Sequence, residues 1–534
     1  MSDEGRPPET ARDGDSTLLR EGGKLSALTM VSRVLGLVRE MTKAAFMGTG
    51  PLAEAFTVAF IIPNFMRRLF AEGSVTVAFI PTFSGILGEK DEAKTREFLS
   101  ATFTVLLVLV CATVALGMAA APWITSLVFY GSEAAETVVL TRMMFPFLAL
   151  VSVAALLQGI LNSIGVFAPS GLGPILFNLC FIGLPYLVGG WTANPARAMA
   201  IGVLAGGLAQ ALCQLPAVLR AGYRFGFIGP RRALANPGMR KVLSLVAPTI
   251  LGMAAYQLND LVCTSLASSV RAAAGIQYSI RLQELILGIF AVSAGTVLLP
   301  RLTASAGRGD WAGYSRDLGS VMRTMILVTI PIALFSMIAG REMVTLLFRA
   351  RAFGEDSVAL TTSVFFFHML GILFIALNRV IAPAFYARSD ALTPTWAGMA
   401  SFGVNIALAF AFIGPFKGPG IAMALSISSA VNTLILAAAL RRSAIEGIRE
   451  AFTATLRYGL RILALSAIAG LPLYFARPWI LGRFAAHPSR LVAAGLPLIL
   501  ESLLYGALGI GLLALSRDKI AASLVARFRR GSRA

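Results

Sequence analysis

Charged residues are scarce in this chain, and histidine is scarcer still. Only 14% of the 534 residues are Asp, Glu, Lys or Arg, and there are two histidines. His368 stands alone in an apolar run, where we expect a buried ring with a satisfied hydrogen bond, and His487 stands in a connecting segment. Neither has a partner at catalytic or metal-ligand spacing, which argues against histidine-based catalysis.

Cysteine is also rare, with four residues in the whole chain, and each lies in an apolar run: Cys111, Cys180, Cys213 and Cys263. None has the CxxC spacing of a metal or redox site. We expect buried, unreactive thiols, and the redox compartment cannot be read from them.

Enzyme motifs are missing as well. The sequence has no GxxxxGK[ST] element for nucleotide phosphates, no HExxH and no GxSxG. The longest connecting segment, residues 220–241, is too short for a catalytic domain. We therefore expect no ATP hydrolysis, no cofactor and no enzyme, and we place the protein's work within the membrane.

Long apolar runs are what the sequence has in abundance. The chain is 57% hydrophobic with a mean hydropathy of +0.76. Runs of about 20 residues, each long enough to cross a hydrocarbon core, recur from end to end. The class is an all-α polytopic membrane protein. About 14 spans are expected, with cores at 25–47, 55–87, 98–122, 137–164, 171–190, 197–219, 242–268, 272–299, 318–339, 357–387, 394–414, 419–440, 457–475 and 490–515.

The distribution of Lys and Arg predicts the orientation. Basic clusters at Arg220–Lys241, Arg301–Arg323, Arg441–Arg461 and Arg517–Arg533 all fall on one face of a 14-span topology. By the positive-inside rule this face is cytoplasmic, so both termini are cytoplasmic. The net charge of +19 then reflects this rule and anionic lipid, not nucleic-acid binding.

An internal repeat organises the spans. The segments Gln158–Asn178 and Asn378–Asn405 share a turn before proline and a later asparagine, and they lie six spans apart. Two parallel six-helix lobes around a central cavity are a transporter architecture. The expected divisions are a disordered cytoplasmic tail (1–24), an N-lobe (25–220), a basic linker (221–241), a C-lobe (242–440), helices 13 and 14 (441–516) and a basic cytoplasmic tail (517–534).

Charges inside the expected spans mark a candidate site. A charge near the bilayer centre costs about 2.5–3.5 kcal/mol on insertion scales, so it should face a wet cavity. Arginines suit a pyrophosphate, whose oxygens accept paired hydrogen bonds from a guanidinium. Candidate substrate-binding residues are Arg33, Arg39, Glu40, Glu54, Arg67 and Glu72 in spans 1 and 2, and Arg281 and Glu284 in span 8. Lys43 and Arg68 fit equally well as residues that hold helices together or reach the interface.

A second polar set could couple transport to an ion. Asn259 and Asp260 in span 7 and Asn405 in span 11 carry oxygens that suit Na⁺, and Asp260 could carry a proton. The coupling ion, whether Na⁺, H⁺ or Cl⁻, cannot be read from the sequence. An interhelical polar contact explains the same residues at least as well.

The elements SRVLGLVRE (32–40) and PNFMRRLFAEGSVTVAFIPTF (63–83) resemble the MurJ/MviN family of bacterial lipid II flippases. That family belongs to the multidrug/oligosaccharidyl-lipid/polysaccharide exporter superfamily. The resemblance continues through APTILGMAAYQLND (247–260), YSIRLQELILGIF (278–290) and LNRVIAPAFYARSDALTPT (377–395). It implies 14 helices, a central cationic cavity with essential arginines at Arg33, Arg39, Arg67 and Arg281, and acidic positions at Glu40, Glu54 and Glu72. It also implies a lipid-tail groove at helices 13 and 14.

The chain departs from the family pattern in a few places. Relatives often carry Asp where this chain has Glu40 and Glu54, Lys where it has Ile61, and Asp where it has Ile280. The arginines are intact, so these departures affect only the finer contacts to a head group.

The expected function is therefore that of a lipid II flippase in peptidoglycan biosynthesis, in the bacterial inner membrane, working by alternating access. Expected partners are lipid II, membrane lipids and cell-wall synthesis enzymes, with no nucleic acid, and we expect a monomer. Alternatives are an exporter of another polyprenyl-linked glycan, a drug/ion antiporter of the same superfamily, and a non-transporting scaffold for cell-wall enzymes.

Overall fold

The structure is a computed structural model that describes residues 9–68 and 78–523, with side chains described outside 9–27, 247–256 and 289–297. Within these ranges every regular element is a helix, which confirms the all-α class. The chain divides into two compact units, Met1–Ser268 and Ser269–Ala534. Each unit is considered by itself.

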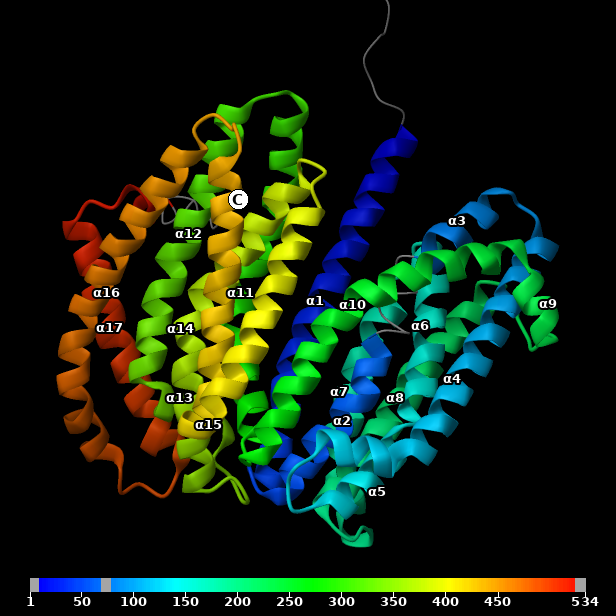
Figure 1. Cartoon of the computed structure of the whole chain (residues 1–534), viewed down its shortest axis with the longest axis horizontal. Helices are drawn as coiled ribbons and strands as arrows, with labels where there is room; N and C mark the ends of the chain where they lie inside the picture. The colour runs from blue at the N-terminus through cyan, green and yellow to red at the C-terminus, as the bar shows by residue number, and fades with distance from the viewer. Residues whose placement is uncertain (1–8, 69–77, 524–534) are drawn as a thin grey trace, which may run out of the picture. The chain divides into compact units, whose positions relative to one another are not determined.

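The first unit carries one run of helices (Figure 1). Its elements are α1 (Glu9–Met47), α2 (Pro51–Arg67), α3 (Ile80–Gly88), α4 (Glu92–Val128), α5 (Ala134–Met144), α6 (Phe147–Ser163), α7 (Ala168–Val188), η3 (Gly189–Trp191), α8 (Pro195–Arg220), α9 (Pro230–Ala235) and α10 (Pro237–Ser269). Helix α7 packs against both α1 and α8, and α8 also packs against α6. The position of α7 matters below because it brings side chains to α1.

Small residues let α7 and α8 approach closely. A Cβ atom at Gly206 would lie 3.0 Å from the carbonyl oxygen of Phe177, and one at Gly202 would lie 3.2 Å from the Cα atom of Phe181. Glycine at such positions is how membrane helices gain contact area without a hydrophobic driving force between them. This close packing holds the backbone of α7 at Phe177 and Phe181 against α8.

The second unit holds the remaining helices (Figure 1). Its elements are α11 (Ala273–Gly307), α12 (Trp311–Ile338), α13 (Gly340–Phe348), α14 (Glu355–Tyr386), α15 (Leu392–Arg442), α16 (Ile448–Phe484), η4 (Leu491–Gly495) and α17 (Leu496–Leu515). Helix α14 packs against α11, α12 and α15, while α12 also packs against α16, and α16 against α17. Fully buried Tyr314 and Leu318 of α12 lie in the main apolar cluster of this unit.

All fourteen expected spans coincide with helices. The described part of the chain contains nine helices that are long and apolar enough to cross a membrane by length and composition. Spans 11 and 12 form the single element α15, which is kinked at Lys417 (φ 51°, ψ −133°) within the sequence GPFKGPG. Span 2 is represented by α2 and α3 on either side of residues that are not described. Two short helices, α9 and α13, lie in segments expected to be loops.

Three details differ from the expectations. Helix α1 begins at Glu9, so it extends back into the segment 1–24 expected to be a disordered tail, because a helix already nucleated by its apolar part propagates at little cost. The compact units divide after Ser268, whereas the expected lobes are separated by the linker 221–241. Met239 and Val242 of α10 are buried in the apolar cluster of the first unit, and the division into lobes stays a prediction. The cysteines are not fully buried, since Cys111 is exposed on α4 and Cys180, Cys213 and Cys263 are half-buried.

Candidate functional site

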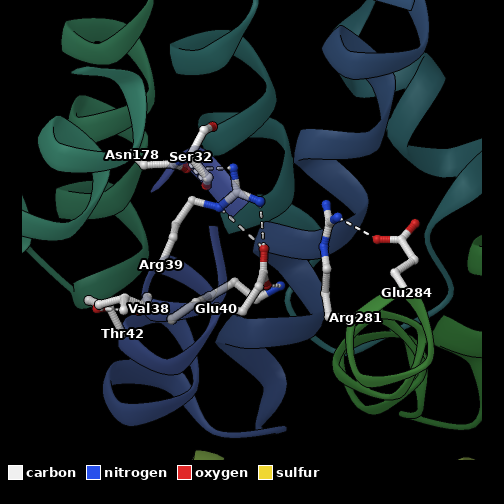
Figure 2. Close-up of polar contacts among 9 residues, drawn as sticks. Ser32, Val38, Arg39, Glu40, Thr42, Asn178, Arg281 and Glu284 are labelled. Atoms are coloured by element: carbon white, nitrogen blue, oxygen red, sulfur yellow. Dashed lines mark hydrogen bonds and ion pairs between the residues drawn. The ribbon is translucent and has the colours of Figure 1, made fainter. Parts of the chain in front are cut away.

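A charged triplet on the last turns of α1 is the best-ordered part of the candidate site. Glu40 Oε1 accepts hydrogen bonds from Arg39 Nη2 at 2.8 Å and Nε at 3.3 Å, and its Oε2 lies 3.1 Å from Lys43 Nζ (Figure 2). The side chains are 17%, 8% and 9% exposed for Arg39, Glu40 and Lys43. One carboxylate therefore orients two cations in a largely desolvated setting, where charge-assisted hydrogen bonds are strong.

Helix α7 completes the surroundings of Arg39. Asn178 Oδ1 accepts from Arg39 Nη1 at 3.2 Å, and Asn178 Nδ2 donates to the carbonyl oxygen of Ser32 at 3.2 Å (Figure 2). The guanidinium carbon also lies 5.8 Å and 5.6 Å from the ring centroids of Phe177 and Phe181. Cation–π contacts of this kind stabilise a desolvated guanidinium. Arg39 is thus held on three sides by its own protein.

Helix α2 supplies further predicted residues. Arg67 Nε donates to Asn64 Oδ1 at 3.0 Å, one turn earlier on the same helix. Arg68 Nη1 donates to Gln257 Oε1 of α10 at 3.0 Å, a contact that ties two helices together, as the alternative interpretation of Arg68 supposes. Glu54 is buried in the first turn of α2, where the helix dipole favours a negative charge.

Two first-unit predictions remain. Arg33 is an exposed residue of α1. Glu72 lies outside the described residues. Within the first unit the structure thus brings together Arg39, Glu40 and Lys43, and it places Arg67 beside Asn64.

In the second unit, α11 carries the predicted pair Arg281 and Glu284. Arg281 Nη1 donates to Glu284 Oε2 at 2.7 Å across one helical turn, with the side chains 43% and 51% exposed (Figure 2). An exposed pair at this spacing contributes little to stability. The structure confirms that the two share a helix face. A role of Arg281 in substrate binding stays a prediction.

The candidate ion-coupling residues are distributed over both units. Asn259 Oδ1 accepts a weak hydrogen bond from Cys263 Sγ at 4.0 Å on α10, next to half-buried Asp260. Asn405 is buried in α15 of the second unit. Among the residues that the structure describes, no three His, Cys, Asp or Glu side chains gather as a metal site would require. A role in ion coupling stays a prediction.

His368 behaves as expected from its apolar surroundings. It is 1% exposed, and its Nδ1 lies 2.6 Å from the hydroxyl of Ser279. Its carbonyl oxygen accepts from Gln283 Nε2 at 2.7 Å. The interpretation as a buried, satisfied histidine is confirmed.

Sequence reasoning missed two groups of polar residues. Asn178 was noted only as a repeat marker, although an amide in an apolar span is itself a signal of a polar contact. Glu342, Arg477 and Glu501 in the second unit are not among the predicted site residues, although Glu501 interrupts an otherwise apolar span. A carboxylate inside a membrane span is by default a candidate functional residue, and this rule identifies Glu501.

The arrangement around Arg39 would allow one anion to replace another as the hydrogen-bond partner of its guanidinium. A phosphate oxygen that replaces the Glu40 carboxylate on Arg39 would meet a guanidinium already fixed by Asn178 and two aromatic rings. Such preorganisation reduces the entropy lost when a ligand binds.

Comparisons with known proteins show the family of the chain. The family described as "Lipid II flippase MurJ" matches residues 43–488. A protein of Treponema pallidum (strain Nichols) named "Probable lipid II flippase MurJ" is 43% identical over 514 residues, 95% of this chain and 97% of that protein. The chain belongs to the MurJ family.

Other MurJ relatives extend the match. A Vibrio cholerae protein named "Probable lipid II flippase MurJ" is 33% identical over 433 residues, covering 78% of this chain and 82% of the relative. A solved structure described as "Lipid II flippase MurJ, inward closed conformation" superimposes with a TM-score of 0.76 at 21% identity, covering 93% of this chain and 99% of that one. The likeness to that structure shows the fold, a multi-pass helical membrane protein.

Proposed function

We propose that this chain moves lipid II, the lipid-linked peptidoglycan precursor, from the cytoplasmic to the periplasmic leaflet of the bacterial inner membrane. Support comes from membership of the MurJ family and from the name of the Treponema relative, with which it shares 43% identity over nearly its whole length. No nucleotide motif is present in the sequence, so the energy is drawn from the membrane potential or an ion gradient.

The pyrophosphate of the substrate binds to Arg39, Arg67 and Arg281 in this proposal. The observation that carries it is the network around Arg39, in which Glu40 and Asn178 hold the guanidinium through hydrogen bonds of 2.8 Å and 3.2 Å. Bidentate hydrogen bonding to phosphate is the strength of arginine over lysine. Residues that complete the substrate contacts are Arg33, Glu40, Glu54, Glu72 and Glu284.

Alternating access moves the head group, while the polyprenyl tail stays in lipid along helices α16 and α17. These helices support a lipid-facing role because large apolar side chains are exposed on both, among them Phe475 and Trp479 on α16 and Leu503 and Ile510 on α17. Keeping the tail in hydrocarbon avoids the cost of drawing apolar surface through a polar cavity. The lobes are 25–220 and 242–440, and both termini are cytoplasmic. Asn259, Asp260 and Asn405 remain candidate ion ligands.

Complementation tests the assignment of the arginines. Cells depleted of their own flippase receive the wild-type chain or the single variants Arg39→Ala, Arg67→Ala and Arg281→Ala. We expect the wild type to restore cell-wall synthesis and each variant to fail, with all proteins at equal levels in the membrane. Arg442→Ala, at an exposed position near the end of α15, is the matched control and restores growth.

Full growth with all three variants would refute the cavity assignment. Binding of purified protein to organic cations but not to lipid II would instead favour a drug exporter. A third outcome would favour a scaffold for cell-wall enzymes. In that case charge reversal in segment 221–241 abolishes growth, while cells with the arginine variants still grow.

A further inference from the structure

Three ionisable side chains in the second unit lie outside the substrate proposal. Glu342 is on α13, Arg477 near the end of α16, and Glu501 in the second turn of α17. Arg477 Nη2 donates to Glu342 Oε1 at 2.7 Å. Glu342 is 3% exposed and Glu501 is not exposed at all. Two carboxylates and one guanidinium thus share a buried region on three helices.

Several atoms of this cluster are shielded and have no hydrogen-bond partner among the described residues. They are both carboxylate oxygens of Glu501, Oε2 of Glu342 and Nε of Arg477. An ionised carboxylate without a donor is strongly unfavourable away from water, and such a group takes up a proton instead. The surroundings of Glu501 therefore favour its neutral acid form.

The charge balance of the cluster also favours a protonated Glu501. Arg477 is hydrogen-bonded to Glu342, and this pair is neutral as a whole. Glu342 and Arg477 are the charged groups that act on Glu501, one repelling and one attracting its negative charge. With one cation for two carboxylates, the cluster is neutral only when it holds one proton.

The other elements packed against α17 add no charge near Glu501. Helix α12 contributes Phe335 and Ile338 to an apolar cluster with Tyr505, which lies one turn beyond Glu501 on the same helix face. The segment η4 (Leu491–Gly495) carries no ionisable residue, and Arg490 just before it donates to the carbonyl oxygen of Arg349 at 2.9 Å. Glu342 and Arg477 are thus the charged groups that face the site.

A pocket lies against one member of the cluster, Glu342. A cavity of about 710 Å³ lies between α13, the loop that follows it, the end of α16 and η4, and Glu342 is in its wall together with His487. Its rim includes Arg341, Arg349 and Glu355, whose side chains are about half exposed. Glu342 thus separates the interior of the cluster from this pocket. The charge pattern of the sequence predicts this side of the protein to be periplasmic.

We propose that Glu501 is a proton-binding site, loaded from the side of this pocket, and that its protonation is coupled to transport. On release, the O–H bond of Glu501 breaks and an O–H bond forms on a water molecule, which carries the proton into the pocket. The negative charge then rests on Glu501, and Arg477 becomes its counter-ion. The coupling rests on the proposed flippase function, whereas the proton site stands independently of it.

Infrared difference spectroscopy tests the site on the purified full chain in lipid nanodiscs. A spectrum at low pH minus one at high pH shows the carbonyl stretch of protonated carboxylic acids. We expect a band in the wild type that is lost in Glu501→Gln and kept in Glu450→Gln, which changes an exposed carboxylate on α16. Glu501→Asp keeps the carboxyl group and should shift the band. A band identical in all four proteins overturns the proposal.

Transport in vesicles tests the coupling. We expect a pH gradient to change the rate of lipid II movement several-fold in the wild type and to leave Glu501→Gln unaffected. Equal responses of the two proteins would overturn the coupling and leave the cluster a structural one. If the wild type moves no lipid II while the infrared band is present, the proposed function fails and the proton site stands.

Discussion

Asn178 holds Arg39 from a helix that lies 139 residues further along the chain, accepting from Nη1 at 3.2 Å while donating to the carbonyl oxygen of Ser32 on the helix that carries the arginine. One amide therefore fixes both the side chain and the backbone of α1. A group that fixes the geometry of a binding residue, without itself being charged, is a positioning residue.

Asn178→Ala should weaken transport without unfolding the protein. Loss of one hydrogen bond to a charged group is worth about 1.5–3 kcal/mol in favourable cases, so we expect about a tenfold drop in the rate of lipid II movement. Asn178→Asp should be at least as damaging, because its charge competes with the phosphate for Arg39. Asn162→Ala, which removes an amide bonded to Ser170, is the matched control. Equal rates for the Asn178 and Asn162 variants would contradict a positioning role.

Glu40→Gln should tighten substrate binding and slow release. The Glu40 carboxylate forms ion pairs with both Arg39 and Lys43. A neutral amide at this position would compete less with a phosphate for these two cations. We expect the Kd for lipid II to fall about tenfold, equivalent to about 1.4 kcal/mol. Direct binding to protein in nanodiscs measures the change. Weaker binding would show that Glu40 acts mainly by orienting Arg39.

Variants of Arg281 and Glu284 distinguish an effect on stability from an effect on transport. Both side chains are about half exposed, so removing the pair should alter the free energy of unfolding by less than about 1 kcal/mol. We expect Glu284→Gln and Arg281→Ala to melt close to the wild type, while Arg281→Ala stops transport. A large loss of thermal stability in either variant would mean that the pair holds the helices together.

Asp390 gives a stability prediction that is independent of transport. It precedes α15, accepting from the Thr393 amide at 3.0 Å and from the Thr393 hydroxyl at 2.7 Å. These hydrogen bonds lower the pKa of its carboxyl group below the ordinary value. The folded state therefore gains stability above the ordinary aspartate pKa, and it loses that gain as the pH falls through the lower, folded pKa.

Asp390→Ala should cost about 1 kcal/mol at neutral pH, the usual value of an N-terminal helix cap. The difference from the wild type should shrink in acid, where the wild-type carboxyl also becomes protonated. Thermal unfolding in detergent across a pH series measures it, with Asp356→Ala, an exposed residue in the first turn of α14, as control. A difference that stays constant down to strongly acidic pH would contradict the capping role.

The sequence predicts the helices well and their contacts poorly, for physical reasons. Apolar runs of sufficient length dictate spans because a bilayer has a fixed thickness, which is why all fourteen coincide with helices. The same reasoning identifies Arg39 and Arg281 as costly charges in apolar segments. It does not identify Asn178 as the partner of Arg39, because interhelical packing decides which distant residue faces it.

The pattern of apolar spans also does not predict the contacts of the segments between spans. Helix α13 is a short helix placed between two spans, and only its packing shows that Glu342 meets Arg477, which is 135 residues away in the sequence. Glu501 differs, since a single carboxylate in the span 490–515 is visible in the sequence itself. Its lack of a hydrogen-bond partner is visible only in the structure.

The most direct measurement of the central claim is movement of lipid II by the purified chain in vesicles with the membrane potential clamped. Fluorescent lipid II in one leaflet is followed as it becomes accessible from the other. The account predicts movement with the wild type, loss of movement with Arg39→Ala, and retained movement with Arg442→Ala. Movement with Arg39→Ala at the wild-type rate, or no movement with the wild type under any potential, would contradict it.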